Sequence, residues 1–163
     1  IAKRALAFDM RVLAKVRTYR ESPMDGVELL EDLDELLQQA DHLVLALPAT
    51  PDSEQLINAR ALAQTKPGVH IVNVARASIL DQESMLPLLD SGHIAGASLD
   101  VITPEPLPDG HWAYSHPRVR LSPHISWNSP EVMTHLMSSF LVNLKAFSQG
   151  GALAGVVDVN AGY

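Results

Sequence analysis

Three residues whose side chains suit anion binding and proton transfer follow one another along the chain: Arg76, Glu105 and His124. Arg76 ends an apolar stretch, and its planar guanidinium is well suited to bind a carboxylate through two hydrogen bonds. His124 can give or take a proton near neutral pH. A carboxylate such as Glu105 can orient the imidazole ring and favour its charged form. Together, the three could bind an acid and exchange a proton with it.

Each of these residues also has a plainer interpretation. Arg76 can lie at the end of a strand and extend its charge into water. Glu105 can be a solvated loop charge, and Asp100, just before it, can cap a turn. A single histidine is more often structural than catalytic. Six further histidines are expected to have no chemical role, namely His42, His70, His93, His111, His116 and His135.

The elements that must position these residues alternate between two kinds. Short apolar runs predict strands at Arg11–Val16, His42–Pro48, His70–Ala75, Ala95–Val101 and Val119–Pro123. Helical periodicity predicts helices at Ile1–Phe8, Val27–Ala40, Asn58–Gln64, from the cap Asp81 to Leu89, and at about Pro130–Ser148. This alternation predicts an α/β fold with an open parallel sheet. The nearly continuous apolar run of the second strand predicts burial on both faces.

Ligands of such sheets bind beyond the carboxyl ends of the strands. Pro48, Arg76, Asp100 and His124 each lie at or just past the end of a predicted strand, so we expect them to line one crevice. Glu105 belongs to a long Pro-rich loop, and loops of that length in compact α/β domains are usually functional.

Composition narrows the possible partners. The formal charge is −7, from 12 basic and 19 acidic residues, which argues against nucleic-acid or anionic-membrane binding. An anionic substrate would therefore need a local cationic clamp. No apolar run approaches the roughly 18 residues of a membrane span. The chain has no cysteine, which excludes thiolate metal sites and agrees with a cytoplasmic location. His111 and His116 lack further ligands nearby, so no metal site is expected.

The order strand–Arg, strand–Asp–loop–Glu, strand–Pro–His resembles the D-isomer-specific 2-hydroxyacid dehydrogenase family. The matching stretches are "LPATPDSEQLIN", "TKPGVHIVNVARASILD", "LLDSGHIAGASLDVITPEPLP" and "RVRLSPHISW". The resemblance covers essentially the whole chain. It implies a Rossmann-like doubly wound parallel sheet and an oxidoreductase that transfers a hydride between NAD(P)H and a small 2-keto acid or D-2-hydroxy acid, of the glyoxylate or hydroxypyruvate type.

The resemblance also implies the role of each residue. His124 would be the general acid/base, Glu105 would hold its imidazole, and Arg76 would bind the carboxylate and carbonyl of the keto acid. Hydride addition builds negative charge on the keto oxygen, which Arg76 and His124 would offset. The cofactor would be lined by Pro48, Val74, Ala75, Arg76, Asp100, His124 and Ser126, with Asp100 at the nicotinamide carboxamide.

The cofactor is expected to be NADP rather than NAD. Val16 stands where NAD-specific enzymes place an acid for the ribose 2′-hydroxyl. Arg17, Thr18 and Arg20 follow it, and this basic stretch suits a 2′-phosphate. The alternative is that these cations are solvated loop residues.

Three features depart from the family pattern. The Gly-rich phosphate loop is absent, and Ile1 aligns inside the first helix. We therefore expect an incomplete sheet without its first strand, and a fragment that would not turn over substrate alone. Residues 1–127 would be a partial NAD(P)-binding domain, and 128–163 a C-terminal helix and tail returning to the substrate domain.

Ala77-Ser78 replace two glycines that are common in the family, and Trp127 replaces a small residue. Trp127 could pack against a neighbouring subunit or limit the substrate's size.

Two other interpretations remain open. The chain could be a nucleotide-sensing binding protein that resembles the C-terminal-binding-protein corepressors, or an inactive fragment. The family's habit of dimerising through the nucleotide-binding domain implies a homodimer, which the apolar content permits.

Overall fold

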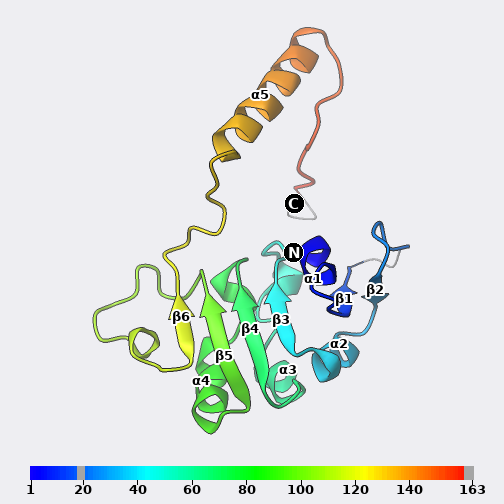
Figure 1. Cartoon of the computed structure of the whole chain (residues 1–163). Coiled ribbons are helices and arrows are strands. Elements are labelled where there is room, and N and C mark those ends of the chain that lie inside the picture. The colour runs from blue at the N-terminus through cyan, green and yellow to red at the C-terminus, as the bar shows by residue number, and fades with distance from the viewer. Residues whose placement is uncertain (18–20, 160–163) are drawn as a thin grey trace.

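Parallel strands form two sheets in the computed structural model, which describes residues 1–17 and 21–159. The smaller sheet pairs β1 (Val12–Lys15) with β2 (Val27–Leu30). The larger contains β3 (His42–Leu45), β4 (Val69–Asn73), β5 (Ile94–Leu99) and β6 (Val119–Leu121), in that order (Figure 1). Every pairing within both sheets is parallel. The expected α/β fold with parallel strands is confirmed.

The expectation of an incomplete sheet without its first strand is confirmed. Within the described residues, β1 pairs with β2 and β3 pairs with β4, and no ladder joins the two sheets. The doubly wound order places a first strand between these two groups. No described strand occupies that position, so the described strands are divided into these two groups.

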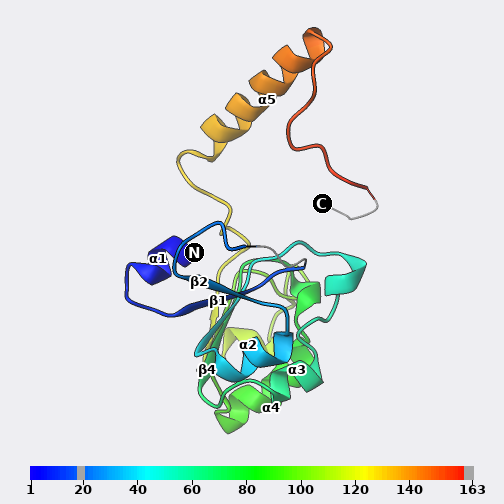
Figure 2. The ribbon, with the colours of Figure 1, turned by 90° about the vertical axis from the view of Figure 1, so that its right-hand side faces the viewer.

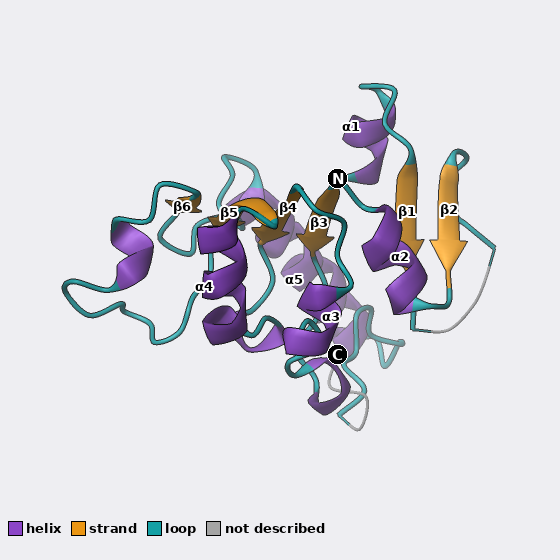
Figure 3. Ribbon diagram, turned by 90° about the horizontal axis from the view of Figure 1, so that it is seen from below, coloured by secondary structure: helices purple, strands orange, loops and turns teal. Residues whose placement is uncertain are grey.

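The helices are α1 (Ala2–Leu6), α2 (Leu33–Gln39), α3 (Ala59–Ala63), α4 (Gln82–Ser91) and α5 (Val132–Ser148). Figure 3 shows α3 and α4 on one side of the larger sheet. The strand residues that face these helices are buried, among them Leu43, Leu45, Ile71, Ala97 and Leu99. The alternate residues of β4, His70 and Val72, are only half-buried. The predicted burial of the His42–Pro48 strand on both faces is wrong, because in β3 Val44 is half-buried and His42 is exposed. The described helices α3 and α4 cover one face of the sheet.

The predicted helix Val27–Ala40 is wrong in its first part. Residues of the strand β2 pair in register with β1, so that Val12 lies opposite Val27. The helix α2 begins after Asp32, whose carboxylate accepts a hydrogen bond from the Asp34 N–H at 2.8 Å. Aspartate is a favoured N-cap, and this cap separates an apolar strand from an apolar helix that follows it almost at once.

The predicted cap of α4 is confirmed, and glycines follow the ends of α4 and α5. Asp81 caps α4 by accepting a hydrogen bond from the Ser84 N–H at 3.0 Å, and Gly92 closes that helix with φ of 80°. Gly150, just beyond α5, has φ of 67°. A side chain disfavours this left-handed backbone, so glycine is suited to both positions.

The helix α5 extends away from the sheets (Figures 1 and 2). None of its residues is buried. Most of its large apolar side chains are exposed, namely Met133, Leu136, Met137, Phe140, Leu141, Val142, Leu144 and Phe147. In the described part of the chain, no helix has both the length and the hydropathy needed to cross a membrane.

Candidate active site

The candidate residues lie where neighbouring strands of the larger sheet end. Arg76 follows β4, Asp100 directly follows β5, and His124 comes soon after β6. Because the strands are parallel, their carboxyl ends meet at the same edge of the sheet. Glu105 belongs to the loop after β5. The fold thus brings together the residues predicted from the sequence to do chemistry.

Glu105 holds the imidazole of His124. The Nδ1 atom lies 3.0 Å from one carboxylate oxygen of Glu105 and 3.3 Å from the other. A carboxylate only accepts hydrogen bonds, so Nδ1 carries the proton in this contact and Nε2 is left for a ligand. The Glu105 side chain is 54% exposed, and exposed pairs add little stability. The contact therefore serves mainly to orient the ring.

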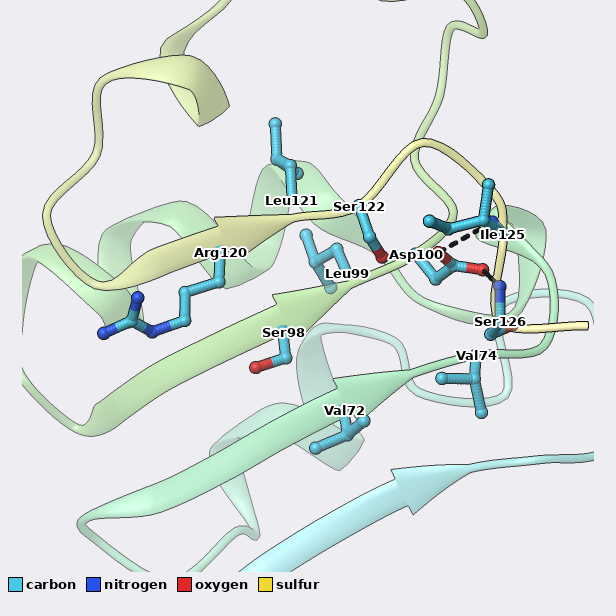
Figure 4. A pocket seen from close by; sticks show the side chains of 10 residues that line it. All are labelled: Val72, Val74, Ser98, Leu99, Asp100, Arg120, Leu121, Ser122, Ile125 and Ser126. Carbon is cyan, nitrogen blue, oxygen red and sulfur yellow. Dashed lines mark hydrogen bonds between the residues drawn. The ribbon is translucent and has the colours of Figure 1, made fainter. Parts of the chain in front are cut away.

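Asp100 holds the turn that contains His124 in place through hydrogen bonds (Figure 4). It is 4% exposed, and its carboxylate accepts hydrogen bonds from the Ser122 hydroxyl and from the backbone N–H groups of Ile125 and Ser126, at 3.0 and 2.8 Å. Burial raises the pKa of Asp100, but the hydrogen bonds from Ser122, Ser126 and Ile125 together outweigh burial and hold this pKa well below its ordinary value. Asp100 therefore stays charged while it binds this turn.

The Asn73 side chain similarly holds the backbone around Arg76 through hydrogen bonds. It is 1% exposed, its amide nitrogen donates to the Arg76 carbonyl at 3.1 Å, and its amide oxygen accepts from the Ala75 N–H at 3.0 Å. The Arg76 side chain is exposed, and its Nη1 donates to the Ala75 carbonyl at 2.7 Å. This bond uses one donor of the guanidinium fork, so other donors can face an anion.

Arg76 and His124 line the same cavity, of about 520 Å³, together with Ile1, Val74, Ser126 and Trp127. The Trp127 indole N–H donates to the His124 carbonyl at 3.0 Å. A cavity that combines a guanidinium, an imidazole and apolar walls fits a small organic anion. A second cavity of about 210 Å³ adjoins it through Val74 and Ser126 and lies against the sheet between β4 and β6 (Figure 4).

Other predicted residues lie apart from this cavity. Pro48 follows β3, accepts a hydrogen bond from the Ser53 hydroxyl, and lines neither cavity. Ala75 is buried beneath the Arg76 turn. Arg17 pairs with Asp52 at 3.0 Å. Thr18 and Arg20 lie outside the described residues. Among the residues that the structure describes, no three His, Cys, Asp or Glu side chains are grouped so that they could hold a metal ion.

Sequence reasoning did not find Asn73 and Ser122. Asn73 is an amide inside an apolar strand, which is a usable signal because a buried amide needs hydrogen-bond partners. Ser122 gives no such signal, since its bond to Asp100 joins residues 22 positions apart.

The residues fit one end of a nicotinamide dinucleotide. A flat aromatic amide needs an apolar wall and polar partners, and the paired cavities offer Val74, Ile125 and Ser126. A pyrophosphate needs a row of backbone N–H groups, such as a Gly-rich loop that leads into a helix. The sequence contains no such loop. The chain therefore fits the nicotinamide end of the cofactor better than its phosphates.

Comparison with known proteins gives a consistent result. A family model described as "D-isomer specific 2-hydroxyacid dehydrogenase, NAD binding domain" matches residues 1–126. The glycerate dehydrogenase of Methylorubrum extorquens is 37% identical over 152 residues, which cover 92% of this chain and 46% of that protein. Glyoxylate/hydroxypyruvate reductase A of Serratia proteamaculans is 33% identical over 168 residues, covering 100% and 52%.

A solved structure agrees with these relatives. The NADPH-dependent glyoxylate/hydroxypyruvate reductase of Sinorhizobium meliloti, in complex with NADP and sulfate, superimposes with a TM-score of 0.90 at 31% identity. The match covers 99% of this chain and 52% of that one. The chain thus spans about half the length of the curated relatives that it matches.

Proposed function

The chain belongs to the D-isomer specific 2-hydroxyacid dehydrogenase family, and from this premise we propose that its full-length gene product reduces a small 2-keto acid to the D-2-hydroxy acid. The observation that carries the proposal is the cavity shared by Arg76 and His124, with Glu105 on the far side of the imidazole. Relatives named as glyoxylate/hydroxypyruvate reductase and glycerate dehydrogenase support this substrate class.

In the proposed mechanism, Arg76 binds the substrate carboxylate and polarises the keto group, as a guanidinium fork suits this planar anion. His124 begins as the imidazolium, with its Nδ1–H held by Glu105 and its Nε2–H directed to the keto oxygen. The nicotinamide cofactor, when bound, supplies the hydride that adds to the keto carbon. The Nε2 proton moves to the oxygen, which completes the hydroxyl and leaves a neutral imidazole. In the reverse direction, His124 takes that proton back.

We propose NADPH as the preferred cofactor. Support comes from Val16, which stands where an acidic residue would bind the 2′-hydroxyl of NAD, and from Arg17 directly after it. Arg17 pairs with Asp52 across the surface, so a 2′-phosphate would have to replace Asp52 as a partner of its guanidinium. The structure of the NADPH-dependent relative in complex with NADP is consistent with this choice.

We propose that Trp127 keeps the substrate small. Its side chain lines the cavity beside His124 and is tied to the turn by the indole N–H. Ala77 and Ser78 begin a short helical turn directly after Arg76 and carry side chains that glycines would lack. Both features favour glyoxylate or hydroxypyruvate over acids with large side chains.

The wider organisation is also a proposal. Residues 1–127 would form the nucleotide-binding part, and 128–163 would pack on a substrate domain, as suggested by α5, in which no residue is buried. A homodimer would form through the nucleotide-binding part, and the cysteine-free sequence agrees with a cytoplasmic enzyme.

Turnover by the full-length protein tests the function. We expect NADPH oxidation with glyoxylate and hydroxypyruvate to be faster than with phenylpyruvate. Arg76→Ala and His124→Ala should each lower kcat/KM by roughly 100-fold or more. His42→Ala is the matched control, because His42 is exposed at the amino end of β3, and it should keep wild-type rates. Near-wild-type reduction by both site variants would refute the assignment, and nucleotide binding without any turnover would favour a binding protein.

A further inference from the structure

We propose that Ser122 is a positioning residue for His124, acting through Asp100. The inference rests on the proposed function, since it concerns how the proton donor is aimed at the substrate. Ser122 is the first residue after β6 and lies two residues before His124. Its hydroxyl donates to the buried Asp100 carboxylate, and that carboxylate holds the two residues that follow His124.

The backbone of His124 needs such support. Its φ is +53°, in the left-handed region that side chains disfavour. A residue keeps this conformation only where its surroundings fix it. The Pro123 ring restricts the approach from one side. On the other side, the N–H groups of Ile125 and Ser126 both point to Asp100. The left-handed turn is thus closed onto one carboxylate.

Ser122 binds this turn twice. Its carbonyl oxygen accepts the His124 N–H at 3.0 Å, and its hydroxyl binds the same Asp100 oxygen that accepts the Ile125 N–H. The N–H of Ser122 donates to the Leu99 carbonyl at 3.0 Å, which extends the pairing of β5 and β6. Ser122 therefore connects the rigid sheet to the His124 turn, and the Trp127 indole tethers the turn from its other end.

Asp100 can link Ser122 to the His124 turn rigidly, because it is 4% exposed and directly follows β5. Without the Ser122 hydroxyl, Asp100 would keep its two backbone donors but lose the one bond that ties its Oδ1 to β6. The carboxylate could then rotate, and the turn would move with it. Small errors in the placement of a reacting group cost large factors in rate.

The first test compares three variants of the full-length protein with hydroxypyruvate and NADPH. Ser122→Ala should lower kcat by about tenfold and change the KM of hydroxypyruvate by less than about twofold, because substrate binding by Arg76 is untouched. Ser122→Thr keeps the hydroxyl and should restore kcat to within about threefold of wild type. Ser84→Ala is the matched control, because Ser84 also donates its hydroxyl to an aspartate, Asp81, but at the start of α4. It should leave kcat unchanged.

A second test measures the turn itself and needs no turnover. Amide hydrogen exchange at Ile125 and Ser126 should be faster in Ser122→Ala than in wild type, and unchanged in Ser84→Ala. Unchanged exchange at these two amides, or a kcat of Ser122→Ala equal to that of wild type, would overturn the inference while leaving the reductase proposal in place. A wild-type protein that reduces none of the keto acids would instead refute the proposed function, and hydrogen exchange would still decide the role of Ser122 in the turn.

Discussion

Two carboxylates support the candidate site at the residue scale, and their surroundings differ. Asp100 is buried and accepts three hydrogen bonds, two of them from backbone N–H groups of the turn that follows His124. Glu105 is half-exposed and contacts the imidazole of His124. Asp100 therefore fixes the turn, whereas Glu105 orients the ring.

Substitutions of Glu105 should separate orientation from charge. Glu105→Gln keeps an oxygen that can accept the Nδ1–H but loses the negative charge, and we expect kcat to fall about tenfold. Glu105→Ala loses both and should cost roughly 100-fold, within the usual range for general acid–base catalysis. Steady-state kinetics of the full-length protein with hydroxypyruvate would measure both values. Equal losses in the two variants would show that the hydrogen-bond acceptor contributes nothing beyond the charge, and wild-type kcat in Glu105→Gln would show that the charge contributes nothing.

The Arg17–Asp52 pair predicts opposite effects on cofactor choice. Arg17→Ala should raise the KM of NADPH by about tenfold while changing that of NADH little, since charge-assisted contacts to a phosphate are lost. Asp52→Asn should lower the KM of NADPH by no more than about fivefold, because both side chains are more than half exposed and such pairs are weak. A wild-type preference for NADH, or KM values for NADPH unaffected by Arg17→Ala, would contradict the NADP assignment.

The sequence was informative about the site residues that follow strand ends. It was less informative about the residues whose hydrogen bonds hold those site residues in place. Arg76, Asp100 and His124 were predictable because parallel strands bring their carboxyl ends to one edge. Ser122 was not, because its partner Asp100 is distant in the sequence. Pro48 obeys the same strand-end rule yet lines neither cavity, so the rule brings residues to the edge without fixing which of them reach a ligand.

At the scale of elements, the larger sheet has one covered and one partly open face. His70 of β4 lies on the open side, and its Nε2 is 3.0 Å from the Ser98 hydroxyl of β5. Burial lowers the pKa of His70 below its ordinary 6.5, and the positive charges of His42 and Arg120 lower it further. His42 lies on the neighbouring strand β3, and Arg120 lies on β6, one strand beyond β5.

This environment predicts a pH dependence of stability. A lowered pKa means that the unfolded chain binds the proton more readily than the folded one. The contribution of neutral His70 to the free energy of unfolding is complete above pH 6.5. It is lost as the pH falls through that value toward the lower pKa that His70 has in the folded state. Urea unfolding at about pH 8 and about pH 5.5 should show a larger loss in wild type than in His70→Gln. Identical losses in the two proteins would contradict the prediction.

The incorrect helix prediction at Val27–Ala40 has a physical cause at this scale. Its two apolar clusters both fit a helical repeat, so periodicity alone could not divide them. Pairing with β1 decides that Val27–Leu30 is a strand, and this pairing is a tertiary contact. The Asp32 cap was the local signal that a helix begins later.

At the scale of the whole molecule, α5 stands apart from the sheets with its apolar side chains exposed. Deleting residues 129–163 from this chain should therefore change its Tm by less than about 3 °C, since α5 adds no buried surface. Leu89→Ala is the comparison, because Leu89 is fully buried and its loss should cost roughly 2–5 kcal/mol. Thermal unfolding followed by circular dichroism measures both, and a drop above about 10 °C on deletion would show that α5 packs on the sheets in solution.

The proposed role of this chain is to supply the proton donor and the anion-binding arginine of a D-specific keto-acid reductase. Its most direct test is label transfer by the full-length protein from NADPH deuterated at both C4 positions to hydroxypyruvate. We predict D-glycerate with deuterium at C2, formed at least roughly 100-fold more slowly by His124→Ala. Glycerate without deuterium at C2, an L product, or equal rates for wild type and His124→Ala would show that the proposed role is wrong.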